Sequence, residues 1–390
     1  MRKVFITGDN IITSLGFTTP GNIIKLQSNT IGFHICDNEA LSPVPIPLSL
    51  VDQPMLDALF GIFIRENNSA LIPENFTRLE KMFILSIHEA IKDTGLDLTD
   101  KRSLLILSTT KGNIDLLEEK NKNLFSRKRI YLWEMAEVIR QVFGFINRPL
   151  IVSNACISGV VAIGIGFRYI RSGMYDNAVV CGGDILSRFV ISGFQSFQSL
   201  SPEPCRPYDI SRKGLSLGEA CGTIVLTSDP SGIHGQKIIV EGTSTSNDAN
   251  HISGPSRTGE ELALAVTRSL KEAHLEPSGI GYISAHGTAT LFNDEMESKA
   301  FSIAGLRDVP LNSFKGYWGH TLGAAGVIES IAAVHSMKDS ILYKSAGFTQ
   351  SGVPEDIHVI AQNREKSFDH LVKTASGFGG CNASVVFGKT

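Results

Sequence analysis

Residues Ser153-Asn154-Ala155-Cys156-Ile157-Ser158-Gly159 are the most informative stretch of this sequence. The apolar run 149–152 leads into it and predicts a buried strand, and the small-residue run 159–171 that leaves it predicts a helix. Cys156 is therefore expected in a sharp turn at the start of the helix, where the positive end of the helix dipole favours a thiolate. Taken alone, a cysteine beside apolar sequence is also typical of an inert core residue. Other motifs in the chain are needed to distinguish a reactive cysteine from an inert one.

The composition of the 390-residue chain favours a large core. Hydrophobic residues make up 42% and charged residues only 19%, so we expect helices covered on more than one side, in stacked layers or in an oligomer interface. The length allows two or three modules of ordinary size. The net charge of −3 argues against a nucleic-acid binder that works by bulk charge.

The six cysteines lie far apart and form no CxxC pair, which supports neither a zinc knuckle nor a redox motif. Their spacing fits reduced thiols in a cytosol. The apolar run Val4-Phe5-Ile6-Thr7 is too short for a signal peptide, and no stretch reaches membrane-spanning length. We therefore expect a cytoplasmic protein without a membrane partner.

Strand-like and helix-like runs alternate along the chain, which predicts an α/β fold with largely parallel sheets. A second series begins near residue 235, so we expect two halves, 1–234 with the cysteine turn and 235–390. The expected strands are 4–7 (closed by a turn at 8–10), 104–107, 149–152, 178–181, 223–226, 237–240, 281–284, 309–312, 372–376 and 383–387. The expected helices are 78–94 (with Gly95 as C-cap), 132–143, 159–171, 260–273, 294–304 and 323–338, with irregular chain at 32–54 and 243–256.

Three candidate catalytic groups share one setting. Cys156, His286 and His320 each follow a strand-like run and lie at or near a turn, and in parallel α/β folds such strand ends face the active-site crevice. Gly287 and Gly319 lie beside the two imidazoles, where a ligand can approach closely. A thiolate with two imidazoles suits acyl transfer, because the thiolate takes the acyl group, imidazole N–H groups hold an enolate oxygen, and backbone N–H groups hold the oxyanion. Metal binding by the same three side chains is the competing hypothesis, although their spacing is not that of a zinc site.

Seven motifs, in the same order, make the sequence resemble the β-ketoacyl-acyl-carrier-protein synthases, the elongating condensing enzymes of the thiolase superfamily. They are Val4-Phe5-Ile6-Thr7-Gly8; Asn154-Ala155-Cys156-Ile157-Ser158; Cys205-Arg206-Pro207-Tyr208-Asp209 with Gly214-Leu215-Ser216-Leu217-Gly218-Glu219; Asp248-Ala249-Asn250-His251; His286-Gly287-Thr288-Ala289-Thr290 with Asp294 and Glu297; Lys315 with His320; and Gly377-Phe378-Gly379-Gly380-Cys381-Asn382. The resemblance runs nearly end to end. It implies a thiolase-like fold of two similar halves stacked as α-β-α-β-α layers, and a dimer.

The resemblance also implies roles for the matching residues. Cys156 would be the acylated nucleophile of a decarboxylative Claisen condensation in fatty-acid or type II polyketide elongation. His286 and His320 would drive malonyl decarboxylation and stabilise the enolate. Lys315 would orient the site electrostatically through Glu297.

The resemblance also implies roles for residues at the entrance of the active site, and it implies binding partners for the chain. Backbone N–H groups of Cys156 and Phe378 would form the oxyanion hole, and the Phe378 side chain would gate entry. Thr288 and Thr290 would hydrogen-bond the phosphopantetheine arm, which arrives on the carrier-protein substrate, so neither a separate cofactor nor a metal is implied. The implied partners are an acyl carrier protein with acyl and malonyl groups, and a second chain, either an identical copy or a chain-length-factor homologue.

The sequence also departs from the family pattern. Ile157 is β-branched where small residues are usual, which predicts a shortened or redirected acyl pocket. Ser376 stands where housekeeping enzymes often have a second aromatic residue, and segments 35–75 and 199–204 look trimmed. These departures favour a specialised elongating synthase, such as those of aryl polyene pathways, over a housekeeping one.

Two other classes stay open. A non-catalytic chain-length factor typically lacks the nucleophile, whereas Cys156, His286, Lys315 and His320 are all present. A degradative thiolase would carry a second catalytic cysteine in a C-terminal glycine-rich turn, and Cys381 lies in such a turn. The spacing of the lysine and the second histidine nevertheless belongs to the decarboxylating branch, and an initiating synthase would have an asparagine in place of that histidine.

The stretch 120–129 is basic, with Lys120, Lys122, Arg127, Lys128 and Arg129. A solvated face is the simple explanation. Because carrier proteins are acidic, we also predict that this stretch docks the carrier protein.

Overall fold

A computed structural model describes residues 2–248 and 254–390 of the chain. Its main sheet contains the strands β1 (Val4–Ile12), β4 (Ser103–Ser108), β5 (Leu150–Val152), β6 (Asn177–Asp184), β8 (Ala220–Thr227), β9 (Ile238–Asn247), β10 (Tyr282–Ser284), β11 (Leu311–Asn312), β14 (His370–Gly377) and β15 (Cys381–Lys389). Across the sheet their order is β11-β10-β14-β15-β9-β1-β8-β6-β4-β5. Residues Ala249, Asn250 and His251 of the expected carrier-tunnel motif lie outside the described residues.

The sheet consists of two five-stranded parts with one strand order. Numbered along the chain within each part, the strands run 3-2-4-5-1 from the outer edge to the middle in both. Strands 3, 2 and 4 pair parallel in each part, whereas strands 4, 5 and 1 pair antiparallel. Within the described residues, the sheet continues from one part to the other through the short antiparallel pairing of β1 with β9 at Val4↔Val240 and Phe5↔Ile239. The expectation of largely parallel sheets is therefore wrong, because antiparallel strands fill the middle.

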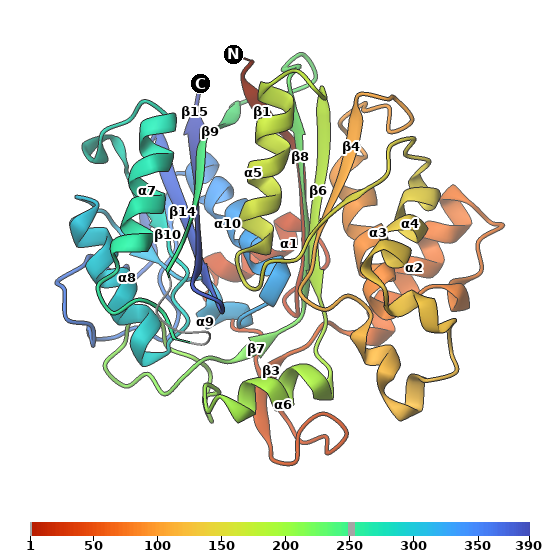
Figure 1. Ribbon diagram of the computed structural model, residues 1–390, viewed down its shortest axis with the longest axis horizontal. Helices are drawn as coiled ribbons and strands as arrows, with labels where there is room; N and C mark the ends of the chain where they lie inside the picture. The colour runs from red at the N-terminus through yellow and green to blue at the C-terminus, as the bar shows by residue number, and fades with distance from the viewer. Residues whose placement is uncertain (1, 249–253) are drawn as a thin grey trace.

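Figure 1 shows helical layers on both outer faces of this sheet and between its two parts. The outer helices are α7 (Glu260–Glu272) and α8 (Leu291–Ile303) on one side, and α2 (Gln53–Asn67), α3 (Arg78–Ile91) and α4 (Leu132–Phe143) on the other. The central helices are α5 (Ser158–Arg171) and α10 (Ala325–Asp339). Nearly every residue of α10 is buried, as expected for a helix covered on all sides.

The two central helices meet at glycines. A Cβ on Gly159 would lie 2.7 Å from the backbone nitrogen of Val327, and a Cβ on Gly326 would lie 2.4 Å from that of Val160. Only residues without a side chain allow two helix backbones to approach this closely. The approach brings the turns that precede α5 and α10 to one place in the molecule.

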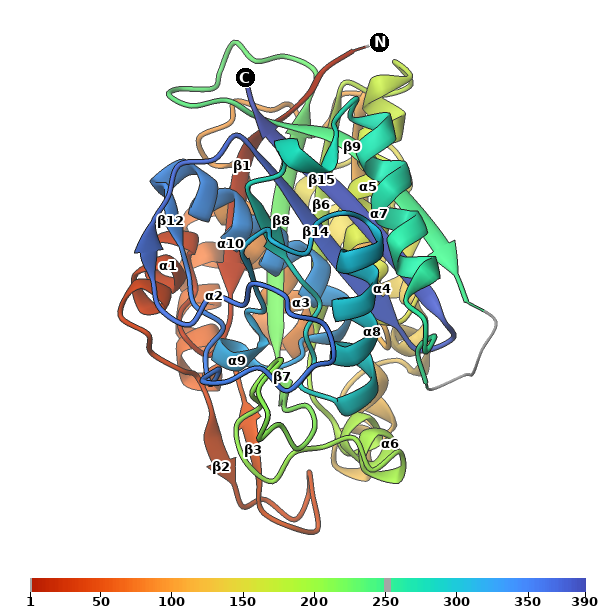
Figure 2. The same ribbon diagram turned by 90° about the vertical axis from the view of Figure 1, so that its left-hand side faces the viewer.

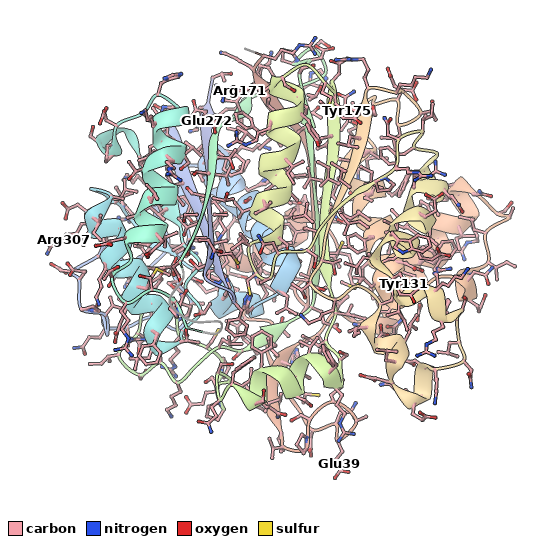
Figure 3. All side chains as sticks on the ribbon, in the orientation of Figure 1. Glu39, Tyr131, Arg171, Tyr175, Glu272 and Arg307 are labelled. Carbon is pink, nitrogen blue, oxygen red and sulfur yellow. The ribbon has the colours of Figure 1, made fainter. Side chains whose placement is uncertain are left out.

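Smaller elements lie at the lower end of the molecule in Figure 1 and along its surface. They are α1 (Thr19–Gln27), α6 (Arg188–Ser196), α9 (Lys315–Trp318), the sheet of β2 (His34–Cys36), β3 (Ile46–Ser49) and β7 (Leu217–Gly218), and the pair β12 (Ile341–Leu342) and β13 (Arg364–Glu365). Figure 2 shows the β2–β3 hairpin projecting from the end opposite both termini. Glu39 marks its tip in Figure 3, and Arg171 at the end of α5 donates to Glu272 of α7 at 2.9 Å near the other end.

Several sequence predictions hold closely, and α4 has the predicted bounds 132–143. The turn expected at 8–10 is wrong, because β1 continues to Ile12 through a bulge between Ile6 and Gly8. Gly8 is needed instead for close packing, since a Cβ there would lie 2.1 Å from the carbonyl oxygen of Ala90 in α3. Gly95 lies in the turn after α3 with φ of +65°, but the C-cap is Lys92.

Other expected boundaries fail where loops were predicted. The segment 32–54 contains β2 and β3, and β9 continues to Asn247 where a loop was expected from 243. The helices α1, α2 and α6 were not predicted. The expected irregular segment ended at Pro54, but this proline lies in the first turn of α2, after the N-cap Asp52, where proline is well tolerated. In the described part of the chain, no helix is long and apolar enough to cross a membrane.

Candidate active site

Cys156 lies in a tight turn between β5 and α5. Ala155 before it has φ of +44°, a left-handed conformation that is strained for a residue with a Cβ. The Ser158 hydroxyl closes the turn, because it accepts from the Asn154 N–H at 2.8 Å and donates to the Ala155 carbonyl at 2.6 Å. The helix begins at Ser158, one residue before the predicted start at Gly159, and Cys156 is 7% exposed.

Burial of Cys156 opposes the thiolate that the helix end was expected to favour. Burial raises the pKa of the thiol to about 12, and the nearby Cys381 adds to the rise. The charges of Lys315 and Lys111 and a hydrogen bond from the Phe378 backbone oppose it without overcoming it. Loss of water around the sulfur therefore outweighs the helix end, and the thiol is protonated until something removes its proton.

The glycine-rich turn between β14 and β15 packs against the cysteine turn. A Cβ on Gly377 would lie 3.1 Å from the Cys156 nitrogen and 3.0 Å from the Cys381 sulfur. The Phe378 ring stacks near Phe194 of α6 at 5.6 Å and near Phe197 at 5.1 Å between centroids. Phe378 thus lies at the cysteine, with its ring held against the end of α6.

His286 follows β10 and is 2% exposed. Its backbone N–H donates to Glu297 of α8 at 2.8 Å, and that of Gly287 donates to the other Glu297 oxygen at 2.6 Å. Gly287 has φ of +42°, and a Cβ there would lie 2.5 Å from the Cβ of Ser313. Glu297 therefore fixes the backbone under the imidazole.

Lys315 contacts Glu329 of α10, not Glu297 as expected. Its ammonium donates to Glu329 Oε1 at 2.7 Å and to the His286 carbonyl at 2.7 Å, and it lies 3.3 Å from His286 Nδ1. Lys315 and Glu329 are both fully buried. Glu329 also accepts from Lys373 of β14 at 2.5 Å.

His320 is 2% exposed and is held by a turn that only glycine can begin. Gly319 has φ of +75° with ψ of −177°, and a Cβ there would lie 2.8 Å from the backbone of Leu217. The His320 Nδ1 accepts from the Leu322 N–H at 3.3 Å. This bond leaves the ring proton of neutral His320 on Nε2.

The two imidazoles form a matched pair. Their ring centroids are 5.2 Å apart and their planes are 86° apart. His286 Nδ1 faces the Lys315 ammonium, which makes it an acceptor and leaves its proton on Nε2 as well. Burial, followed by the charges of Lys315 and Lys373, lowers the pKa of both histidines well below the usual range. Two neutral Nε2–H donors therefore lie at one site.

The predicted pantetheine contacts, Thr288 and Thr290, lie together beyond His286. Their hydroxyl oxygens are 2.8 Å apart, and the Thr288 N–H donates to buried Asp294 at 3.0 Å. Ala289 between them has φ of +63°. The turn is thus fixed by its backbone, with two hydroxyls side by side.

The basic stretch 120–129 is partly engaged within the protein. Arg129 pairs with buried Glu80, and Lys120 and Lys122 lie 3.2 and 3.4 Å from Glu118 and Glu119. Among the described residues, Arg127 and Lys128 have no ion-pair partner. Within 2–248 and 254–390, no group of three His, Cys, Asp or Glu side chains is arranged for a metal ion.

The sequence interpretation missed Glu329 and Lys373. Each is the one charged residue of a mainly apolar run, Val327 to Ala333 and Leu371 to Ala375. Such a charge is expected to be paired when buried, and this was the available signal. Ile157, expected in the acyl pocket, is 1% exposed and packs in the core around the central helices.

Comparison with known proteins identifies the family. The chain matches the models of the β-ketoacyl synthase N-terminal domain at residues 69–231 and C-terminal domain at 238–349. It is 30% identical over 329 residues to 3-oxoacyl-[acyl-carrier-protein] synthase 2 of Vibrio harveyi, covering 77% of this chain and 79% of that protein. The fold and site define a condensing acyltransferase, and the chain belongs to the β-ketoacyl synthase family.

Solved structures agree with this assignment. The chain is similar to a chain of the complex of the ketosynthase ApeO with its chain length factor ApeC from Xenorhabdus doucetiae, with a TM-score of 0.84, 25% identity and coverage of 100% of this chain and 98% of that chain. It is also similar to the ishigamide ketosynthase/chain length factor, with a TM-score of 0.88, 25% identity and coverage of 99% of both chains. The predicted thiolase-like α/β fold with layered halves is confirmed.

Proposed function

We propose that this chain elongates carrier-bound acyl groups, with Cys156 as the nucleophile and His286 and His320 as the decarboxylating pair. The substrates are an acyl carrier protein bearing the acyl group and one bearing malonate. No separate cofactor takes part, because the phosphopantetheine comes with the substrate. A reduced, cytoplasmic setting suits a reaction that needs a free thiol.

In the first half-reaction the Cys156 sulfur attacks the carrier thioester. The sulfur loses its proton, a new thioester forms, and the carrier leaves as a thiol that takes up a proton. Because burial raises the pKa of the thiol, the sulfur has to give up its proton before or as the carbon–sulfur bond forms. The backbone N–H groups of Cys156 and Phe378 hold the oxyanion, and the Phe378 contact with the sulfur supports this assignment.

In the second half-reaction malonyl-carrier loses CO2 and leaves an enolate. The Nε2–H groups of His286 and His320 donate to the enolate oxygen. These hydrogen bonds strengthen as negative charge develops on that oxygen. The enolate carbon then attacks the acyl group on Cys156, forms the new carbon–carbon bond and releases the thiolate, which regains a proton. Thr288 and Thr290 hydrogen-bond the pantetheine arm, and Glu297 holds the His286 turn.

The observation that carries the proposal is the histidine pair. Both imidazoles are buried and neutral, have their Nδ1 atoms occupied, and have ring centroids 5.2 Å apart. A non-catalytic chain-length factor has no use for this arrangement. A thiolase would use Cys381 as an acid, but burial raises the pKa of its thiol to about 11, and its sulfur contacts the Phe378 carbonyl at 3.4 Å.

We also propose a division of the chain into 1–234 and 235–390, which the repeated strand order supports. The pathway is proposed to be a specialised type II polyketide or fatty-acid one, with the partner subunit either a second copy or a chain-length-factor homologue. Relatives that are solved as such complexes support the second option.

The test is intact-protein mass after incubation with carrier-bound acyl groups that are saturated, polyunsaturated or aryl. Wild type should gain the acyl mass, whereas Cys156→Ala should not. The acyl group that labels Cys156 best indicates the class of pathway. Absence of labelling by every donor, both alone and with a supplied partner subunit, would contradict the proposal.

A further inference from the structure

Lys373 is a buried lysine beside the proposed site, and the half-reactions above give it no role. It lies in β14 opposite Ser284 of β10, two residues before His286, and is fully buried. Its ammonium donates to Glu329 Oε2 at 2.5 Å and to the Ala285 carbonyl at 3.2 Å. A lysine is rarely buried without a partner, so its position needs a reason.

Lys315 and Lys373 make parallel sets of contacts. Each donates to one oxygen of Glu329 and to one of two successive backbone carbonyls, Lys315 to His286 and Lys373 to Ala285. Glu329 is therefore shared evenly, with one oxygen for each lysine. We call Lys315, Glu329 and Lys373 the two-lysine clamp.

The even sharing determines what Lys315 can do. An ammonium has three protons, and Lys315 directs them to Glu329 Oε1, the His286 carbonyl and His286 Nδ1. If Lys373 were absent, Glu329 Oε2 would be a buried carboxylate oxygen without its partner. Such an oxygen is costly, and Lys315 is the nearest cation that could satisfy it. A shift of Lys315 toward Glu329 would remove it from His286.

We propose that Lys373 is a positioning residue for malonyl decarboxylation, which it supports by holding Glu329 so that Lys315 stays on His286. The inference rests on the proposed function and adds a residue to it. In the described part of the chain, the hydrogen bonds of Lys373 go to Glu329 and the Ala285 carbonyl and not to the cysteine turn or Phe378, so we expect the acylation of Cys156 to be independent of it.

The charges around Lys373 also link it to the two histidines. The groups that face Lys373 are Glu329 of α10, Lys315 of α9 and Glu297 of α8, which accepts from the neighbouring Thr374 hydroxyl at 3.2 Å. The Lys373 charge is one cause of the low pKa of both histidines. Its removal therefore raises the pKa of His286 and moves the acid-side loss of decarboxylation to higher pH.

The test compares Lys373→Met with wild type in two separate assays. CO2 release from malonyl-carrier should fall about 10- to 100-fold, the expected effect of losing one charge-assisted hydrogen bond in the site. Acylation of Cys156, followed by mass, should stay within about threefold. Lys373→Gln, which still donates a hydrogen bond, should lose less CO2 release and serves if the first variant fails to fold.

Lys366→Met is the matched control. Lys366 is another partly buried lysine that donates to a backbone carbonyl, that of Gly281 at the far end of β10, at 3.0 Å. It should leave both assays unchanged. The inference is overturned if the Lys373 variants release CO2 at the wild-type rate, or if both assays fall together. Failure of the wild type to acylate Cys156 would instead contradict the proposed function.

Discussion

Gly159→Ala tests whether the contact between the central helices sets the active-site geometry. The new Cβ would lie 2.7 Å from the Val327 nitrogen, 2.9 Å from the Gly326 Cα and 3.1 Å from the Gly323 carbonyl oxygen. All three are backbone atoms of the segment that follows His320, so no side-chain rotation relieves the overlap. Ordinary contact begins near 3.4 Å, and the helices must therefore separate by about 0.7 Å.

This separation has two calculable consequences. Overpacking costs about 1–3 kcal/mol, and replacing a helical glycine returns about 1 kcal/mol, so the net loss of stability is about 0–2 kcal/mol. Catalysis is more sensitive, because a misplacement of about 1 Å costs on the order of 100-fold. Moving Cys156 away from His320 by this distance should slow condensation at least about tenfold.

The assay measures condensation and Cys156 acylation on one preparation, with urea unfolding as the check on stability. Acylation uses the turn before α5 and the Phe378 backbone, which is not part of the segment that the new Cβ meets, so it should stay within about threefold of wild type. Gly61→Ala in α2 is the control, because the nearest atom to its new Cβ is the end of the flexible Arg65 side chain at 3.6 Å. Condensation by Gly159→Ala at the wild-type rate would refute the argument that this glycine contact places the two catalytic turns.

Three further predictions follow from the site and its surface. His320→Ala should slow condensation at least about 100-fold through loss of one enolate donor while Cys156 still acylates, and equal rates in a condensation assay would contradict the mechanism. Iodoacetamide alkylation of Cys156, followed by mass, should rise about tenfold per pH unit between pH 7 and 9, because burial raises the thiol pKa to about 12 and thiolate is scarce below it; a plateau in this range would be inconsistent with that pKa. Arg127→Glu with Lys128→Glu should raise KM for carrier-bound substrate about 3- to 30-fold at low salt and less at high salt, whereas Arg307→Glu, on the far side of the molecule (Figure 3), should not; an unchanged KM at low salt would remove the docking hypothesis.

Sequence could predict those parts of the site whose conformation is set by residues adjacent in the chain. The turn at Cys156, the positive φ of Gly287 and the backbone of Gly319 each follow from a few adjacent residues. The glycine at position 8 shows the limit of this approach, because glycine suits both a turn and a close contact. The nearby helix α3, which lies about 80 residues further along the chain, decides between them.

The partner of Lys315 could not be found in this way. Glu297 was expected because it accompanies the histidine motif in sequence, but it binds the backbone of His286. Glu329 and Lys373 are 44 residues apart, and their contact depends on how α10 packs against β14. The same packing buries both charges, so the pairing is a property of the folded layers and not of either segment.

The repeated strand order explains why residues so far apart in sequence reach one site. Cys156 lies between the third strand and the central helix of the N-terminal part, and His320 lies between the third strand and the central helix of the C-terminal part. They therefore occupy equivalent places in the repeat, and the glycine contact between α5 and α10 brings those places together. His286 follows the second strand of its part, β10, and Lys111 follows the second strand of the other part, β4. In the proposed mechanism each equivalent turn has a different role, with the nucleophile in one part and the enolate donors in the other, so that mechanism requires both parts at fixed separation.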